Sequence, residues 1–172
     1  EELIYLPLVE SAFDPSATSS AGAAGIWQLM PETARRFGLR VDWWVDERRD
    51  VFRATDAAIS YLKYLHAQFG DWKLALAAYN AGEGTIDRAM KASGEGFSRS
   101  LVPTRLSEQT HSYVPRFAAA VCAVQRLEQS KDVIAGAQRS PSSVPIAVRG
   151  ATDLRELAQA VGIPWKEFHA LN

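Results

Sequence analysis

Glu10 is the residue whose surroundings most favour acid–base chemistry. It lies near the end of an apolar helical pattern, in the sequence LVESAF at residues 8–13. Apolar neighbours desolvate a carboxylate and the C-terminus of a helix presents partial negative charge, so both raise its pKa. A glutamic acid that keeps its proton near neutral pH can act as a general acid. The alternative is a solvated surface glutamate at a helix end.

A second segment suits carbohydrate binding. Residues 22–31 read GAAGIWQLMP, and glycines at 22 and 25 let the backbone approach another group closely. Gln28 offers one acceptor and two donors, which match sugar hydroxyls or an amide. Trp27 can lie against the face of a sugar. The alternative is a tight turn with a buried tryptophan.

A third segment, AYNAGEG at residues 78–84, follows an apolar helix. It places the polar groups of Tyr79 and Asn80 where that helix breaks. The alternative is a helix cap, with Asn80 or Gly82 in the left-handed conformation. Capping is compatible with a function, which would be additional to it.

Other chemistries find little support. His66, His111 and His169 are scattered, and the sequence has no metalloprotease motif, phosphate loop or nucleophile elbow. The acidic residues of 42–50 lack the spacing of a calcium loop, and we interpret them as a solvated loop plus a helix cap. Cys122 lies beside an apolar stripe and is expected to be a small buried side chain. We therefore expect no metal and no cofactor.

Helical periodicity recurs from residue 1 to residue 129. The first pattern should stop before Pro15, and a short helix should open at Pro31 and end before Gly38. Asp50 is the expected N-cap of a helix that reaches Phe69. Further helices are predicted over 72–79, 84–92 and about 107–129, the last with Val114, Phe117, Val121 and Val124 on one stripe, and loops over 14–25, 39–49 and 93–106.

The C-terminal part changes in character. Residues 130–143 are rich in Ser, Gln, Gly and Pro and are predicted to be a linker. A strand-like run follows over 144–148, and two short helical patterns complete residues 144–172. About 29 residues are too few to fold alone comfortably, so this α/β piece is an appendage.

Composition bounds the function. With 172 residues, 47% of them apolar, the chain can bury one core. A formal net charge of −1 without a basic stripe argues against nucleic-acid binding. No apolar run approaches the ~20 residues of a membrane span, so we expect no transmembrane segment in this chain. Because the chain opens on Glu1-Glu2 and runs straight into a helix, we expect a fragment of a longer precursor.

The three segments, in this order, resemble the lytic transglycosylase domain of the lysozyme superfamily over residues 1–129. The stretches LPLVESAFDP at 6–15 and EQTHSYVP at 108–115 are similar to the membrane-bound lytic murein transglycosylase D branch. The resemblance implies a mostly α, lysozyme-like helical domain of the goose-lysozyme or SLT type. Residues 144–172 resemble the segment that precedes LysM repeats in this branch, and are shorter than a complete LysM.

The resemblance also implies roles for individual residues. Glu10 matches the single catalytic acid/base, Tyr79 would bond or orient its carboxyl, and Asn80 would contact the sugar next to the cleaved bond. Trp27 stands where many relatives carry methionine. The residues implied to line the glycan cleft are Ser11, Ser19, Gln28, Met30, Tyr79, Asn80, Glu108 and Tyr113.

The implied reaction cleaves the MurNAc-β-1,4-GlcNAc bond of peptidoglycan without water and leaves 1,6-anhydroMurNAc ends. The sequence itself supports only the acid, and the non-hydrolytic outcome comes from the resemblance. A goose-type-lysozyme-like hydrolase, an inactive glycan-binding domain and an all-helical interaction protein stay open as alternatives.

The same resemblance implies a place and a partner. The partner would be the glycan strands of peptidoglycan, and the place would be the periplasm or cell envelope. Anchoring to the outer membrane would use a segment that precedes residue 1. A monomer is favoured, although the sequence leaves the oligomeric state open.

Overall fold

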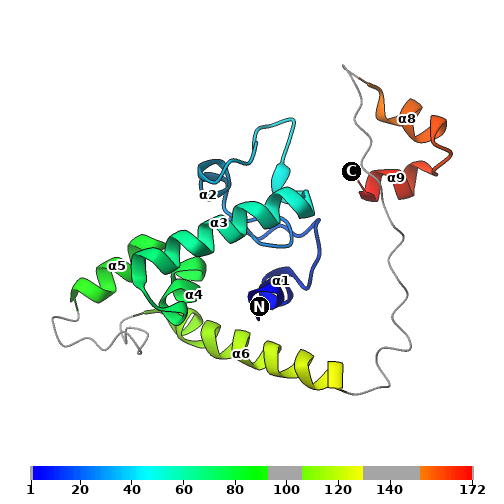
Figure 1. Cartoon of the computed structure of the whole chain (residues 1–172). Helices are drawn as coiled ribbons and strands as arrows, with labels where there is room; N and C mark the ends of the chain where they lie inside the picture. Colours follow the sequence, from blue (N-terminus) through cyan, green and yellow to red (C-terminus); the bar gives the residue numbers. More distant parts are fainter. Residues whose placement is uncertain (1, 93–105, 130–151, 172) are drawn as a thin grey trace. The chain divides into compact units, whose positions relative to one another are not determined.

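The computed structural model describes residues 2–92, 106–129 and 152–171, and the chain divides into two units, Glu1–Ala135 and Gly136–Asn172. The described parts are mostly helical, which confirms the predicted fold class (Figure 1). Only isolated β-bridges are found in these parts. The first unit contains η1 (Glu2–Tyr5), α1 (Leu6–Ser11), α2 (Pro31–Arg36), η2 (Glu47–Arg49), α3 (Val51–Phe69), α4 (Trp72–Ala81), α5 (Glu83–Ala92) and α6 (Glu108–Gln129).

Local capping explains where the two central helices begin and end. The Asp50 side chain accepts hydrogen bonds from the first turn of α3, as predicted, and Gly70 ends that helix at φ 69°. Asp71 caps α4 in the same way. α4 continues through Asn80 to Ala81, two residues beyond the prediction, and Gly82 at φ 84° ends it. Asn80 is therefore helical, and Gly82 is the C-cap residue of α4.

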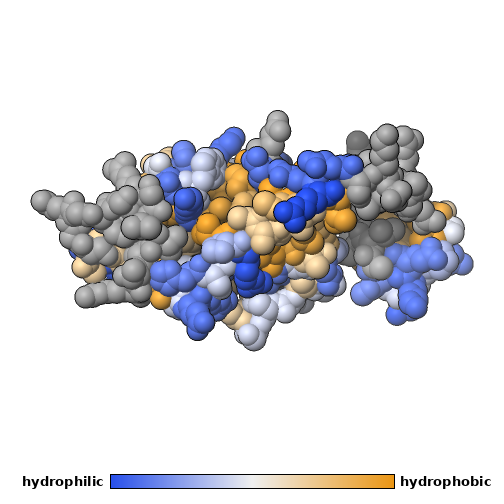
Figure 2. All heavy atoms as spheres, turned by 90° about the horizontal axis from the view of Figure 1, so that it is seen from below, coloured by the Kyte–Doolittle hydropathy of each residue, from blue (hydrophilic) through white to orange (hydrophobic). Residues whose placement is uncertain are grey.

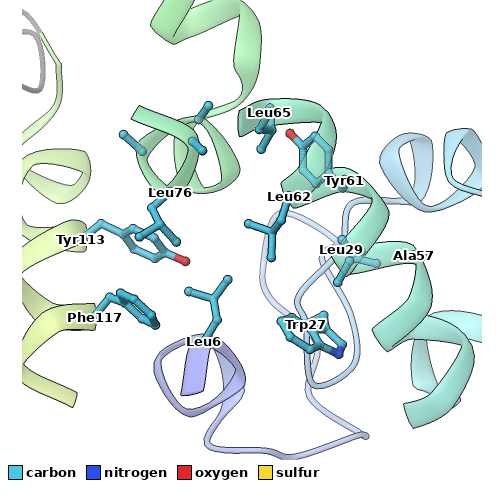
Figure 3. Packing of buried hydrophobic residues seen from close by; sticks show 14 of the residues in the cluster. Leu6, Trp27, Leu29, Ala57, Tyr61, Leu62, Leu65, Leu76, Tyr113 and Phe117 are labelled. Carbon is cyan, nitrogen blue, oxygen red and sulfur yellow. The ribbon is translucent and has the colours of Figure 1, made fainter. Parts of the chain in front are cut away.

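The core of the first unit forms around α4, which packs against α3, α5 and α6. Three of its four alanines, at 75, 77 and 78, are fully buried, and their small side chains allow neighbouring helices to approach closely. Figure 3 shows side chains from different elements pointing toward one another in this core. They include Leu6 of α1, Leu62 of α3, Leu76 of α4 and Phe117 of α6.

Helix α6 buries a stripe at intervals of four residues. Tyr113, Phe117 and Val121 are buried, whereas the predicted stripe members Val114 and Val124 are half-buried. Cys122 is exposed, so the expectation of a small buried side chain was wrong. One residue beyond Val121 lies about 100° further round the helix, which turns the thiol away from the core.

Apolar side chains also reach the surface, and Figure 2 shows hydrophobic residues gathered on one face between hydrophilic margins. Phe52 is 79% exposed, and the adjacent Trp43 and Trp44 are 90% and 75% exposed. The two tryptophan rings contact each other edge-on, with centroids 5.1 Å apart. The predicted loop over 39–49 is confirmed, apart from the short η2 turn within it.

The second unit is described over residues 152–171 alone. It holds α8 (Leu154–Ala160), capped by Asp153, and α9 (Trp165–Leu171), where helical patterns were predicted. The Arg155 guanidinium lies over the Trp165 ring at 4.8 Å. The predicted linker over 130–143 and the strand-like run over 144–148 lie outside the described residues.

Residues 12–30 connect α1 to α2, and the part of this connection over residues 17–29, here called loop 17–29, is folded on itself by backbone hydrogen bonds. The amide of Gly25 donates to Ala17 O, and the amide of Ala24 donates to Leu29 O. Gly25 has φ 76°, and a Cβ there would lie 1.8 Å from the carbonyl oxygen of Arg48. Only glycine satisfies both the backbone angle and this contact.

We therefore predict that Gly25→Ala lowers the free energy of unfolding by about 3 kcal/mol or more, because overlap with backbone adds to the strain of positive φ. Gly38→Ala is the matched control, since Gly38 has φ 91° and open space around it. It should cost only about 1–2 kcal/mol. Urea denaturation of both variants measures the difference, and equal losses would show that the contact with Arg48 does not matter.

Candidate active site

Glu10 lies half-buried at the end of α1, one residue before the last. The helix ends at Ser11, earlier than the limit set by Pro15, because Ala12 adopts the left-handed conformation at φ 54°. Phe13 follows at φ 62°. Two successive non-glycine residues at positive φ store strain, and such strain is commonly found at functional sites.

The surroundings of Glu10 act on its pKa in opposite directions. Burial is the largest effect and raises the pKa above its ordinary value of 4.5. The Tyr113 hydroxyl, which donates a hydrogen bond to Glu10 Oε1, and the positive charge of Arg116 both lower it. The net result is a raised pKa, as predicted from the sequence. The carboxyl thus has one fixed donor and an environment that favours its protonated form.

Ser11 ties the end of α1 to loop 17–29. Its hydroxyl donates to Ile26 O at 2.9 Å, with a longer contact to Pro7 O at 3.3 Å. The residue next to the acid is therefore held by the backbone of the loop. This hydrogen bond fixes where Glu10 lies relative to Gln28.

Tyr79 holds the same loop from the opposite side. Its hydroxyl donates to Trp27 O at 2.8 Å, so the hydrogen bond to the Glu10 carboxyl comes from Tyr113 instead. Burial, followed by the negative charge of Glu10, raises the pKa of Tyr79 and keeps it a donor. Trp27 is 4% exposed, and its indole N–H donates to Thr55 Oγ1 at 2.8 Å. Trp27 is therefore buried, so its ring does not lie against the face of a sugar.

The remaining residues of the loop present polar groups in fixed positions. Gln28 has φ 48°, and its Nε2 donates to Gly25 O at 2.9 Å. Ser19 Oγ accepts from the amide of Ala23 at 3.0 Å. Met30 is 43% exposed and directly precedes α2. The positive φ of Gln28 and the hydrogen bond from its side chain to Gly25 O together fix the direction of this side chain.

Asn80 opens onto a cavity of about 270 Å³ between α4 and the start of α6. Polar groups of Ser107 and Thr110, which lie 3.0 Å apart, form part of its wall. Glu108, predicted to close the cleft, is exposed and is not among the lining residues. The full lining is Asn80, Ala81, Thr85, Leu106, Ser107, Gln109 and Thr110.

The Transglycosylase SLT domain family matches residues 1–101 of the chain. The chain belongs to this family. The SLT-domain chain is 48% identical over 120 residues to membrane-bound lytic murein transglycosylase D of Escherichia coli K12. The matched region covers 69% of the chain and 26% of that relative. The chain is also 35% identical over 82 residues to soluble lytic murein transglycosylase of the same strain, covering 45% and 13%.

A solved structure shares the fold. An inactive glutamate-to-glutamine mutant of lytic transglycosylase Slt from Pseudomonas aeruginosa superposes with a TM-score of 0.57 at 27% identity, over 77% of the chain and 22% of that protein. The SLT-domain chain thus spans about a quarter of the first curated relative and a similar share of this neighbour. The family and the fold that the sequence motifs suggested are both confirmed.

Two supporting residues of the SLT domain were missed from the sequence. Thr55, which holds Trp27, and Arg48, which is buried, carry no motif of their own. Asp46 was interpreted as part of a solvated loop, and this was wrong, because it pairs with Arg48 at 2.7 Å. An arginine inside a polar stretch gives no signal of burial unless its distant partners are known.

Neither a metal cluster nor a membrane span is found in the described ranges. Among residues 2–92, 106–129 and 152–171, no group of three or more His, Cys, Asp or Glu side chains could hold a metal ion. Within the same part of the chain, no helix is both long and apolar enough to cross a membrane.

The raised pKa of Glu10 makes stability depend on pH. The folded state holds this proton more tightly than the unfolded chain, so the contribution is present at low pH and is lost as pH rises through the folded-state pKa, above 4.5. We predict that Glu10→Gln, which cannot ionise, gains stability over the wild type between about pH 4 and about pH 7.

Urea denaturation at both pH values measures this gain. Glu32→Gln, the same substitution at an exposed position, controls for the chemical change itself. A difference between Glu10→Gln and wild type that stays constant with pH would contradict the burial argument.

Proposed function

We propose that this chain is the catalytic domain of a peptidoglycan lytic transglycosylase that uses Glu10 first as acid and then as base. The observation that carries the proposal is the half-buried Glu10 carboxyl, with its raised pKa and its hydrogen bond from Tyr113. The names of the relatives, lytic murein transglycosylases, support the substrate class. The Pseudomonas enzyme is inactive when one of its glutamates is replaced by glutamine, which supports a central role for a glutamate in that enzyme.

In the first step, Glu10 donates its proton to the oxygen between MurNAc and GlcNAc. Burial favours the protonated acid before the step. Once the proton has left, the Tyr113 hydroxyl stabilises the carboxylate, because a hydrogen bond to the charged form is the stronger one. As the bond between C1 of the muramyl sugar and the glycosidic oxygen breaks, GlcNAc leaves with the proton. The positive charge that develops at C1 can be stabilised by the carbonyl of the substrate's own N-acetyl group.

In the second step, the muramyl C6 hydroxyl attacks C1 while Glu10 takes its proton. The product is a 1,6-anhydroMurNAc end, and no water is consumed. Most glycosidases use two carboxylates. The nearest acidic residue in sequence, Asp14, is exposed, and its carboxylate accepts from the amide and hydroxyl of Ser16. Those contacts lower its pKa, which suits a turn residue and not a second acid.

The glycan strand would lie against loop 17–29 and the adjoining ends of α4 and α6. Gln28 would offer its Oε1 as an acceptor to sugar hydroxyls, because its Nε2 donates to Gly25 O and Ala17 O. Asn80 would contact the sugar beside the cleaved bond. Tyr79 would act through Trp27 and the loop, since its hydroxyl donates there. The proposed cleft residues are Ser11, Ser19, Gln28, Met30, Tyr79, Asn80, Glu108 and Tyr113.

The proposed place of action is the cell envelope, where peptidoglycan lies. The membrane-bound relative supports an envelope enzyme. We propose the periplasm as the compartment, attachment to the outer membrane in the whole protein, and a monomeric domain.

The decisive experiment digests purified peptidoglycan sacculi and weighs the released muropeptides. We predict anhydro ends from the wild type, and for Glu10→Gln a loss of turnover of about a thousandfold or more, with binding of glycan fragments retained. Glu32→Gln serves as the control for a general effect of removing a carboxylate. Reducing ends would replace the proposal with a lysozyme-type hydrolase, and activity near wild type in Glu10→Gln would show that another group is the acid.

A further inference from the structure

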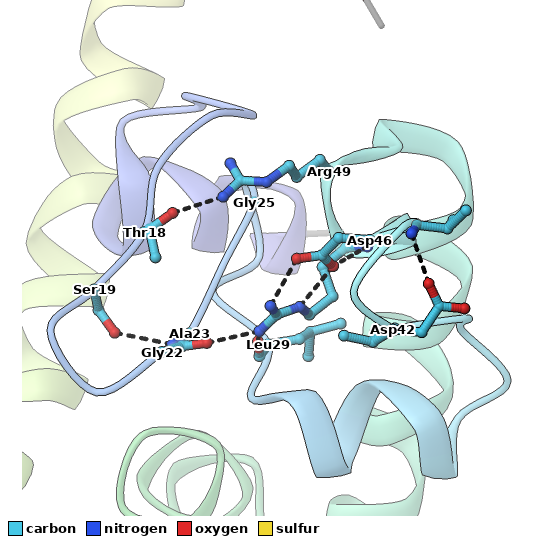
Figure 4. Close-up of polar contacts among 12 residues, drawn as sticks. Thr18, Ser19, Gly22, Ala23, Gly25, Leu29, Asp42, Asp46 and Arg49 are labelled. Atoms are coloured by element: carbon cyan, nitrogen blue, oxygen red, sulfur yellow. Dashed lines mark hydrogen bonds and ion pairs between the residues drawn. The ribbon is translucent and has the colours of Figure 1, made fainter.

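Arg48 is an unusual charge in this fold, because it is 7% exposed. Charged side chains are seldom buried unless every donor has a partner. Its Nε and Nη2 donate to the two oxygens of Asp46 at 2.8 and 2.7 Å, a bidentate pair (Figure 4). The pair uses one edge of the guanidinium group and leaves Nη1 directed elsewhere.

Nη1 of Arg48 donates to two carbonyl oxygens of loop 17–29. One is Gly22 O at 2.7 Å and the other is Leu29 O at 2.9 Å. A single nitrogen thus binds both ends of residues 22–29, the segment that contains Gln28. The backbone of Arg48 holds the middle of the same segment, because its carbonyl oxygen leaves no room for a Cβ at Gly25.

The clamped segment is also the one that reaches the acid. Ile26 O accepts from Ser11, the neighbour of Glu10, and Trp27 O accepts from Tyr79. A displacement of the segment would therefore move Gln28 and the end of α1 together. Errors of about 1 Å in such positions can cost about a hundredfold in rate.

We propose that Arg48, held by Asp46, is a positioning residue that sets loop 17–29 in the geometry needed for glycan binding and for the placement of Glu10. The inference rests on the proposed function for its activity readout. Lysine keeps the charge at this position but lacks the planar fork that reaches one carboxylate and two carbonyls at once. Arg48→Lys therefore separates geometry from charge.

The test compares Arg48→Lys and Asp46→Asn with the control Arg53→Lys. Arg53 also pairs with an acidic residue, Glu47 at 2.7 Å, but is 63% exposed. All variants are assayed for kcat and KM on soluble glycan strands, at a temperature where circular dichroism shows each to be folded. In Arg48→Lys and Asp46→Asn we expect kcat/KM to fall about tenfold to a hundredfold, with a rise in KM. In the control Arg53→Lys it should stay near the wild-type value.

Hydrogen exchange of backbone amides gives a readout that does not need activity. The amides of Ala24, Gly25 and Gln28 should exchange faster in the Arg48 and Asp46 variants than in the wild type, while the amides of α3 and α4 keep their protection. If the wild type does not cleave peptidoglycan, the proposed function fails. The exchange result still tests whether Arg48 holds loop 17–29 in place. Unchanged loop exchange, or an unchanged kcat/KM in a wild type that is active, would overturn the positioning role.

Discussion

The hydrogen bond from Tyr113 to Glu10 joins residues 103 positions apart and sets the chemical state of the site. A carboxyl at the end of a six-residue helix would ordinarily face water. Here the first turns of α6 cover it, so burial raises its pKa while one donor remains to stabilise the charged form. The role proposed for Glu10, first acid and then base, needs both properties, because either one alone would hold the group in a single protonation state.

The rest of the first unit can be understood as support for this contact. The small side chains along α4 let α6 pack closely, and the buried Tyr113 and Phe117 fix the face that α6 turns toward α1. On the other side, loop 17–29 is held at Ile26 by Ser11, at Trp27 by Tyr79, and at Gly22 and Leu29 by Arg48. The acid is thus placed between a helix and a loop that are each fixed independently.

Local signals in the sequence predicted the helices and the acid. Asp50 and Gly70 mark the limits of α3 because caps act within one turn. Glu10 could be recognised because its apolar neighbours adjoin it in sequence. Tyr79 was expected to bond or orient the Glu10 carboxyl, whereas the donor is Tyr113, which only the packing of α6 brings to this position. Arg48 was missed and Cys122 was wrongly expected to be buried, because burial depends on partners and on rotation about a helix, which composition does not reveal.

The most direct test of this account is a pH titration of the Glu10 side-chain carboxyl by carbon-13 NMR. The wild type should titrate with a pKa above 4.5, because burial outweighs the hydrogen bond and Arg116. Tyr113→Phe removes a group that lowers the pKa, so its midpoint should move higher still. A wild-type midpoint at or below 4.5, or no upward movement in Tyr113→Phe, would contradict the claim that burial and this one donor together set the acid.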